Sequence, residues 1–329
     1  MTAYVPHPVG LMPGDKIGDW IIRKRLGSGS FGTVFQVECE AVLFALKFSL
    51  RRLDSEDLNH TAARLQKELA CLLQIRHPNI VRTYAYGHWP HPANGYPYLV
   101  MDYVEGPTLH QWRQRAVPTF RQVLELFCQL ALTMDALDHA QIRHRDLKGS
   151  NILVRASDGE PVLVDFGSAD YEHSLRLTEG PLPPGTPHYR SPESLRFQRE
   201  NIRRPEAHYL FQLTDDLYSL GVTLYELLAG CAPFSPELPR EVLYIEIERK
   251  QPRSPALFDG RIPEALSQLV LRMLAKKPEQ RPQSGQEVYD ALQALLREGG
   301  PLLDERLFVQ HLEAPPTELE LAQEVRGPT

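Results

Sequence analysis

The sequence predicts an α+β protein built from two lobes, a small antiparallel β-sheet lobe with one main helix and a larger, mainly helical lobe. Three observations support this prediction. The chain has 329 residues, which suits two packed cores better than one. Residues 20–48 combine β-branched and aromatic residues with punctuating glycines, a pattern typical of an antiparallel meander. After Gly106 and Pro107, apolar residues recur with a period near 3.6, which indicates long helices.

The small lobe is predicted from the first third of the chain. Five strands are expected, at residues 20–22, 32–37, 43–48, 81–86 and 98–101. Leucines at helical spacing predict the main helix over residues 65–73, and it should end near His77 because a residue before proline avoids the α region. The proline-rich residues 88–97 are expected to form a loop between the last two strands.

The large lobe and the two ends complete the predicted organisation. Its long helices are expected at residues 120–139, 216–229, 264–274 and 285–296. We therefore divide the chain into an N-terminal extension (1–16), a small lobe (17–102), a large lobe (103–297) and an acidic C-terminal tail (298–329). The first 14 residues, rich in Pro and Gly, are expected to be poorly ordered. For the tail, docking on the helical lobe, binding a partner and linking to a further segment stay open.

The bulk composition narrows the class of protein. Apolar residues make up 42% of the chain and charged residues 24%, proportions usual for a soluble globular protein. The formal net charge of −6 argues against nucleic-acid binding, which usually requires a basic excess. The chain opens without a signal sequence, and its most apolar stretch, residues 220–234, is shorter than the roughly 20 residues of a membrane span. Four scattered cysteines favour reduced thiols, so we expect a cytoplasmic protein without a membrane span.

A glycine-rich turn between the first two long strands suits phosphate binding. Its sequence is Gly27-Ser28-Gly29-Ser30-Phe31-Gly32-Thr33-Val34. Glycines let backbone N–H groups approach an anion closely without side-chain bulk. A plain β-hairpin turn is the alternative, and this motif alone does not decide between the two.

Lys47 lies in the apolar strand 43–48, where a lysine usually extends its ammonium into solvent. The alternative is that Glu68, on the following amphipathic helix, pairs with Lys47 and directs its ammonium at phosphate oxygens. Further along, His144-Arg145-Asp146 is followed by Asn151, and then by Asp165-Phe166-Gly167. Carboxylate and amide oxygens are the ligands that Mg²⁺ prefers, although isolated aspartates also serve as turn or capping residues. The order of these motifs indicates a nucleotide-dependent phosphotransferase.

Together these residues resemble the protein kinase family, specifically its serine/threonine branch as found in bacterial cytosolic enzymes. The resemblance runs from about Ile17 to about Leu296 and also includes Ser-Pro-Glu at 191–193, the motif at 216–221 and Arg281. It implies a bilobal protein kinase-like fold. It also implies ATP- and Mg²⁺-dependent transfer of the γ-phosphate to Ser and Thr hydroxyls of protein substrates, with transient self-association for autophosphorylation.

The resemblance assigns catalytic roles to four residues. Asp146 would orient or deprotonate the substrate hydroxyl, and Lys148 would steady the γ-phosphate. Lys47 would hold the α- and β-phosphates, with Glu68 as its partner. These roles agree with the chemistry, because phosphoryl transfer depends on positioning and on neutralising charge.

The resemblance also implies a metal site and a nucleotide site. Asn151 and Asp165 would bind Mg²⁺. The nucleotide-binding residues would be Leu26, Gly27, Ser28, Gly29, Ser30, Phe31, Gly32, Val34, Ala45, Lys47, Met101, Asp102, Val104 and Leu153. Val34 and Ala45 would cover the adenine from one side and Leu153 from the other, while ordinary core packing is the competing explanation for such apolar positions.

Residues 165–193 resemble an activation segment. Its candidate phosphorylation sites are Ser168, Tyr171, Ser174, Thr178 and Thr186. We favour Thr178, whose phosphate would pair with Arg145 and order the segment; Thr186 is expected to contact the catalytic loop instead. An unphosphorylated segment, or Glu179 as the anion, is the alternative. The arginine-bearing residues 195–213 are expected to be a solvated loop rather than a docking site.

Two other functions remain as alternatives to an active protein kinase. A pseudokinase would bind nucleotide without turnover, but its usual sign, loss of Lys47, Asp146 or Asp165, is absent. A small-molecule kinase of related fold would share the aspartate–asparagine loop. Against it, the motifs at 191–193 and 216–221 favour a protein substrate.

Overall fold

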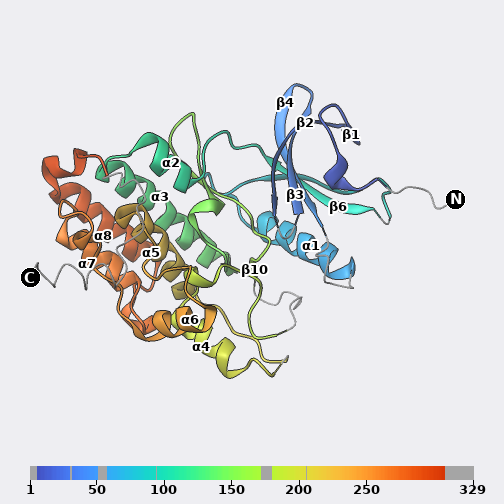
Figure 1. Ribbon diagram of the computed structural model, residues 1–329. Helices are drawn as coiled ribbons and strands as arrows, with labels where there is room; N and C mark the ends of the chain where they lie inside the picture. Colours follow the sequence, from blue (N-terminus) through green and yellow to red (C-terminus); the bar gives the residue numbers. More distant parts are fainter. Residues whose placement is uncertain are drawn as a thin grey trace, which may run out of the picture.

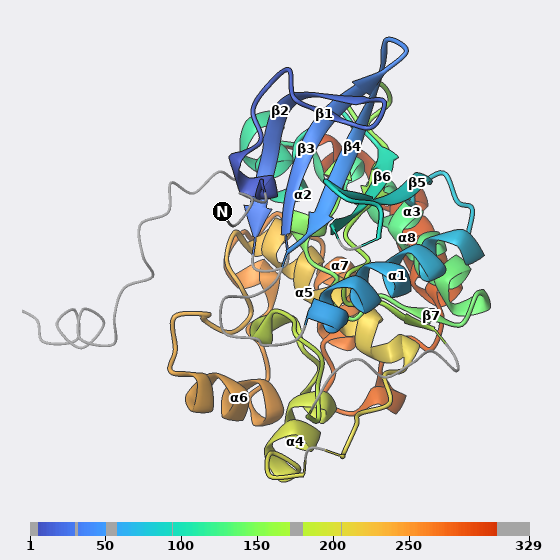
Figure 2. The ribbon, with the colours of Figure 1, turned by 90° about the vertical axis from the view of Figure 1, so that its right-hand side faces the viewer.

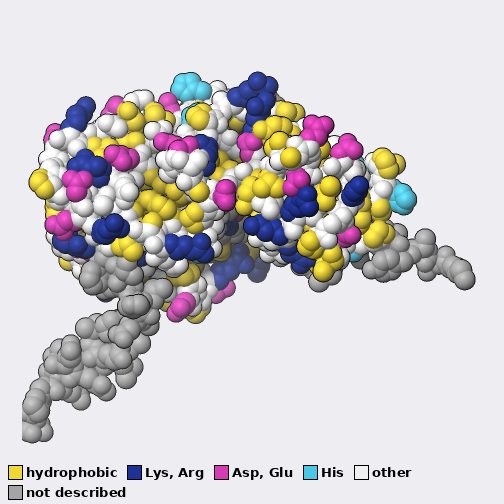
Figure 3. All heavy atoms as spheres, turned by 90° about the horizontal axis from the view of Figure 1, so that it is seen from above, with side chains coloured by type: hydrophobic (Ala, Val, Ile, Leu, Met, Phe, Trp, Pro, Cys, Tyr) yellow, Lys and Arg dark blue, Asp and Glu magenta, His cyan; other side chains and the backbone are white. Residues whose placement is uncertain are grey.

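A computed structural model describes residues 6–29, 32–50, 58–93, 95–171, 180–204 and 206–307. Within these ranges the chain forms a small sheet-rich lobe and a larger helical lobe, which lie side by side in Figure 1. The predicted two-lobed α+β architecture is therefore confirmed. Seen from above, the surface is indented where the two lobes meet (Figure 3).

A six-stranded antiparallel sheet forms the small lobe, in the order β1-β2-β3-β4-β6-β5. Its strands are β1 (Lys16–Ile17), β2 (Trp20–Gly29), β3 (Gly32–Cys39), β4 (Val42–Ser49), β5 (Thr83–Trp89) and β6 (Tyr96–Asp102). Helix α1 (Leu58–Gln74) packs against β4, β5 and β6, as Figure 2 shows. The predicted loop 88–97 is shorter than expected, because both flanking strands continue into it as a hairpin.

The sheet has a second apolar face, away from α1, which the N-terminal segment covers. Leu11 is 7% exposed and packs with Ile17, Phe35 and Phe48 in a separate apolar cluster. Backbone hydrogen bonds fix this segment, among them Gly14 N to Ile22 O at 2.8 Å. The expectation of poor order over the first 14 residues is therefore wrong for residues 6–14, because Leu11 supplies an apolar anchor within a Pro- and Gly-rich stretch. Residues 1–5 lie outside the described part.

Seven helices in the described ranges form the large lobe. They are α2 (Leu109–Ala116), α3 (Phe120–His139), α4 (Pro192–Glu200), α5 (Leu213–Ala229), α6 (Arg240–Arg249), α7 (Glu264–Met273) and α8 (Gly285–Glu298). Helix α5 is buried along almost its whole length and forms the centre of the lobe. It begins three residues before the predicted start, because the Asp215 carboxylate accepts a hydrogen bond from Gln212 N at 2.7 Å and caps the first turn.

Short strands and 3₁₀ turns complete the fold. Two two-stranded sheets pair β7 (Ile142–Arg143) with β10 (Asp170–Tyr171), and β8 (Ile152–Val154) with β9 (Pro161–Leu163). Six 3₁₀ turns are described: η1 (Pro8–Gly10), η2 (Gly149–Asn151), η3 (Pro187–Tyr189), η4 (Pro255–Leu257), η5 (Pro278–Gln280) and η6 (Gly300–Asp304). No helix in these ranges combines the length and apolar character needed to cross a bilayer.

The start of the C-terminal tail docks on the helical lobe. Leu303 and Leu307 are buried in the main core, and Leu307 N donates to Pro118 O at 2.8 Å. An ion pair of 2.6 Å between Arg121 and Asp304 lies at the surface of the same contact. Of the three alternatives for the tail, docking therefore holds for residues 300–307, whereas residues 308–329 lie outside the described part.

Candidate active site

Lys47 on β4 and Glu68 on α1 form the first half of the site. Both Glu68 carboxylate oxygens accept hydrogen bonds of 2.8 Å from Lys47 Nζ. Asp165, from the large lobe, accepts a third of 2.7 Å. The Lys47 side chain is only 12% exposed, so Lys47 pairs with Glu68 and does not extend into solvent; its role toward phosphate stays a prediction.

The electrostatics of this cluster keep its lysine charged. Burial alone would lower the pKa of Lys47, but Asp165 and Glu68 outweigh burial and raise that pKa above its usual value. In turn, the Lys47 ammonium lowers the pKa of Asp165 to about 2. Asp165 is therefore ionised at neutral pH, and its side chain is 49% exposed.

Asp146 and Lys148 form the second half of the site, in the loop after β7. Lys148 Nζ donates to Asp146 Oδ2 and to Thr186 Oγ1, both at 2.8 Å. The backbone N–H and the hydroxyl of Thr186 each donate to Asp146 Oδ1 at 3.1 Å. The expected contact between Thr186 and the catalytic loop is therefore present, and it ties residues 180–190 to Asp146.

Asn151 and Asp165 offer the oxygens that a Mg²⁺ ion requires. Asn151 Nδ2 donates to Asp146 O at 2.8 Å, which leaves the amide oxygen available. Val164 N donates to Asn151 O at 2.9 Å, so Asn151 lies beside the residue that precedes Asp165. Among the described residues no group of three or more His, Cys, Asp or Glu could hold a metal. Two protein ligands still fit Mg²⁺, which usually completes its shell with water and substrate phosphates.

A buried aspartate that sequence reasoning did not assign fixes the catalytic loop. Asp216, near the start of α5, accepts hydrogen bonds from His144 N at 2.8 Å and Arg145 N at 2.9 Å. It thereby holds Arg145 at a φ of 64°, a conformation rare for a side-chain-bearing residue. The sequence analysis included Asp216 only as part of the kinase-like motif at 216–221. The motif therefore pointed to this residue, but it did not reveal that Asp216 binds the backbone of the catalytic loop.

The glycine-rich motif lies in the hairpin between β2 and β3. Gly27 pairs with Val34, and Ser28 pairs with Thr33, whose hydroxyls lie 3.0 Å apart. A β carbon at Gly32 would lie 1.9 Å from Phe48 O, so this glycine is required for strand packing as well. Ser30 and Phe31 lie outside the described residues; Leu26 is exposed.

The remaining predicted nucleotide residues lie at the connection between the lobes. Ala45 and Met101 are paired across β4 and β6 and are buried, whereas Val104 and Leu153 are half-buried. The Asp102 carboxylate accepts from Tyr84 Oη at 2.7 Å and from Arg82 N at 3.0 Å. Asp102 N also donates to Arg82 O at 2.9 Å, so this N–H group is engaged within the protein.

One expectation about basic residues stays a prediction, and another is corrected by the structure. Arg145 pairs with Asp170 at 2.6 Å, and its expected contact with a phosphate on Thr178 stays a prediction because Thr178 lies outside the described residues. Residues 195–213 are not a simple solvated loop, because α4 lies within them. Arg199 pairs there with the buried Glu248 of α6 at 2.7 Å.

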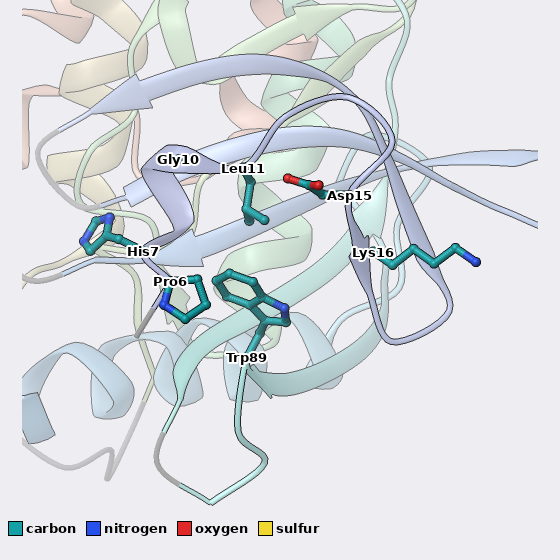
Figure 4. Close-up of a pocket in the computed structure, with 7 residues that line it drawn as sticks. All are labelled: Pro6, His7, Gly10, Leu11, Asp15, Lys16 and Trp89. Atoms are coloured by element: carbon teal, nitrogen blue, oxygen red, sulfur yellow. The ribbon is translucent and has the colours of Figure 1, made fainter. Parts of the chain in front are cut away.

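A separate cavity of about 310 Å³ lies on the outer side of the small lobe. Figure 4 shows Leu11 and Trp89 facing each other in it, beneath the N-terminal segment. None of its lining residues was a predicted site residue. They are Pro6, His7, Gly10, Leu11, Asp15, Lys16 and Trp89.

Three features of the site are those of a protein kinase. They are a small-lobe lysine paired with a helix glutamate, an aspartate held by a second lysine, and an asparagine–aspartate set in the large lobe. Comparisons with known proteins agree. The family model described as "Protein kinase domain" matches residues 20–293. The chain therefore belongs to the protein kinase family, and the bilobal kinase-like fold is confirmed. Members of this family generally use ATP and Mg²⁺.

Individual relatives indicate to which branch of the protein kinase family the chain belongs. The chain is 32% identical to the "Serine/threonine-protein kinase pkn3" of Myxococcus xanthus over 289 residues, 84% of this chain and 50% of that protein. It is 33% identical to the "Serine/threonine-protein kinase PknB" of Mycobacterium tuberculosis over 230 residues, 68% of this chain and 34% of that protein. This chain therefore belongs to the serine/threonine branch of the family. It spans half or less of the length of these two relatives.

Proposed function

We propose that this chain is an active protein serine/threonine kinase, which transfers the γ-phosphate of ATP to hydroxyls of protein substrates. The observation that carries this proposal is the intact cluster in which Lys47 meets both Glu68 and Asp165. A pseudokinase would be expected to lack one of these groups. A protein rather than a small molecule as the substrate is supported by residues 180–193. Within this segment, Thr186 contacts the catalytic loop and the residues that follow lead into α4.

On the nucleotide side, we propose that Lys47 binds phosphate oxygens while Glu68 keeps its ammonium in place. Asn151 and Asp165 would hold Mg²⁺, whose charge offsets that of the phosphates. The half-exposed carboxylate of Asp165 supports this role. Val34, Ala45 and Leu153 would flank the adenine, and the chain around Val104 would supply backbone hydrogen bonds.

On the acceptor side, we propose that Asp146 orients the substrate hydroxyl and takes its proton. The hydroxyl oxygen forms a bond to the γ-phosphorus as the bond between that phosphorus and the bridging β-γ oxygen breaks. Lys148 is 2.8 Å from Asp146, where its ammonium offsets negative charge beside the reacting oxygens. Thr186 fixes the second carboxylate oxygen and so limits the rotation of Asp146.

We also propose a cytoplasmic setting. All four cysteines are free thiols, as expected in a reducing compartment. Burial raises the pKa of Cys71 to about 12 and that of Cys128 to about 11, so neither thiol is poised for oxidation.

The test is transfer of labelled γ-phosphate from Mg·ATP to the protein itself and to a basic acceptor protein. Asp146→Ala is expected to lower kcat by about 10² to 10⁴, the usual contribution of a general base. A matched control is Asp158→Ala, which removes an exposed aspartate of the same lobe and should leave kcat unchanged. Near-wild-type transfer by Asp146→Ala would refute the assignment. A rate of self-labelling that grows faster than protein concentration would support self-association.

A further inference from the structure

The carboxylate of Asp170 lies between two cations from different parts of the fold. Arg145 Nη1 donates to Asp170 Oδ2 at 2.6 Å, and Lys67 Nζ lies 2.5 Å from Asp170 Oδ1. Lys67 belongs to α1, Arg145 to the catalytic loop and Asp170 to β10. One side chain therefore bridges the small lobe and the large lobe, outside the groups that would touch ATP or substrate.

The Arg145 guanidinium is fully engaged at this point. In addition to the bond with Asp170, its Nε donates to Ser168 O at 2.6 Å and its Nη2 to Ala169 O at 3.3 Å. Every nitrogen of the guanidinium thus binds one of three consecutive residues, 168–170. The side chain is 11% exposed, and its carbon Cζ lies 5.5 Å from the centre of the Phe211 ring. Arg145 therefore holds the turn after Asp165 in place.

The bridge acts on both halves of the candidate active site. Lys67 is adjacent to Glu68, so α1 is anchored at two points: Glu68 through Lys47 to Asp165, and Lys67 directly to Asp170. Arg145 directly precedes Asp146 in the chain, and the pairing of Asp170 with Arg143 across β10 and β7 holds the same loop. A shift of Asp170 would therefore move both the helix that carries Glu68 and the loop that carries Asp146.

The carboxylate of Asp170 offsets part of the positive charge of Lys67 and Arg145. Burial lowers the pKa of Lys67, Asp170 opposes that shift and Arg145 adds to it. Without Asp170 the ammonium and the guanidinium would face each other in a largely buried space. Removing one member of a buried charge network leaves uncompensated charge, which is more costly than losing the bond itself.

We propose that Asp170 is a positioning residue that holds α1 and the catalytic loop in their working arrangement through Lys67 and Arg145. Because this built-in carboxylate fills the place expected for a phosphate, the kinase reaches its working arrangement without phosphorylation of its activation segment. This inference rests on the proposed kinase activity above.

The experiment compares Asp170→Asn with the wild type and with Asp138→Asn. Asp138 is a matched control, because it pairs with Arg143 of the same loop at 2.7 Å and has a similar exposed fraction, 36% against 34% for Asp170. Each protein is treated with a protein phosphatase, shown by intact mass to carry no phosphate, and freed of the phosphatase. Two quantities are then measured: the initial rate of transfer to a basic acceptor protein, and hydrogen exchange of residues 62–74 in α1.

Wild type and Asp138→Asn are expected to keep their initial rates after dephosphorylation. Asp170→Asn is expected to lose about 10- to 100-fold in kcat, as misplaced catalytic groups do, with faster exchange in α1 and unchanged exchange in α5. Asp170→Glu should recover part of the rate, because it restores the charge. A wild type that loses its rate on dephosphorylation would overturn the proposal, as would an Asp170→Asn protein with normal kcat.

The exchange measurement separates this inference from the proposed function. If no protein transfers phosphate, the kinase activity is refuted on its own. Exchange in α1 then still decides the positioning role: faster exchange in Asp170→Asn supports the bridge, and unchanged exchange overturns it. If α5 also exchanges faster in Asp170→Asn, Asp170→Glu decides the role: recovery of slow exchange in α1 supports the bridge, and no recovery overturns it.

Discussion

Two lysines with little solvent contact, one in each lobe, have opposite electrostatic surroundings. Lys47 in the small lobe meets two carboxylates, and its pKa is raised. Lys276 in the large lobe donates to Ile247 O at 2.7 Å and lies 4.4 Å from the centre of the Phe234 ring. Burial and the nearby Arg281 lower the pKa of Lys276 to about 7.

This difference separates a binding lysine from a packing lysine. The carboxylates around Lys47 keep it charged at neutral pH, and one of them is half exposed, so the ammonium is available to an anionic ligand. Lys276 makes no ion pair with a carboxylate of the described part of the chain, and its neighbours favour the neutral amine. Burial alone therefore does not mark a functional lysine; the partners do.

The largest expected effect concerns Arg281, the cation beside Lys276. Arg281 is 1% exposed, and its guanidinium binds Glu193 through two hydrogen bonds of 2.7 Å. Arg281→Ala should lower the free energy of unfolding by about 3 to 5 kcal/mol, because it removes a buried cation and leaves the largely buried Glu193 carboxylate without its partner. Urea unfolding of the full chain measures this loss. Arg121→Ala, which breaks only the surface pair with Asp304, should leave the unfolding curve nearly unchanged.

Next in size is the effect of Lys47→Met on catalysis. Loss of the ammonium should lower kcat/KM by about 10² to 10³, the usual range for one charge-stabilising donor, while the circular-dichroism melt stays cooperative. Lys276→Met should leave kcat/KM within about twofold of the wild type, if surroundings rather than burial decide function. Equal losses of kcat/KM in both variants would contradict the distinction between a binding and a packing lysine. Loss of a cooperative melting transition in Lys47→Met would mean that Lys47 is structural.

The last expected effect is the pH dependence of stability due to Lys276. The pKa of Lys276 lies near its usual value of 10.5 in the unfolded chain and near 7 in the folded protein. Between these values the unfolded state binds more protons, so stability should rise as the pH rises from about 7 to about 10. Unfolding free energies of wild type and Lys276→Met over this range should diverge accordingly, with the variant giving the flatter curve. The exposed Lys277→Met serves as the control; an identical slope for Lys276→Met and wild type would contradict the assignment.

Local patterns in the sequence predicted the elements that carry strong periodicity. Helix α3 has the predicted ends, and α7 and α8 differ from prediction by one or two residues at their C-terminal ends. The short helices α2 and α4 were missed because polar and charged residues dominate them. Helix α6 was missed because its apolar residues run almost consecutively and do not recur at helical spacing. Leu11 was missed for a related reason, since the few apolar residues among the prolines and glycines near it show no period.

The candidate site was predictable where motif residues carry the chemistry and not where distant residues support them. The pairing of Lys47 with Glu68 was one of two alternatives from the sequence, and the structure decided between them. The roles of Asp216 and Asp170 depend on which backbone or cation each carboxylate meets after folding. Those contacts join segments far apart in the chain, so no local pattern identifies them.

The N-terminal segment determines where a usable fragment of this chain can begin. A fragment starting at residue 17, where the kinase-like motifs begin, would lack Leu11 and the backbone bond from Gly14. It would leave Phe35 and Phe48 at an uncovered sheet surface, and such surfaces promote aggregation. For recombinant production, the fragment should therefore begin at or before Pro6. A fragment without the N-terminal segment would contain every motif but would be more prone to aggregate.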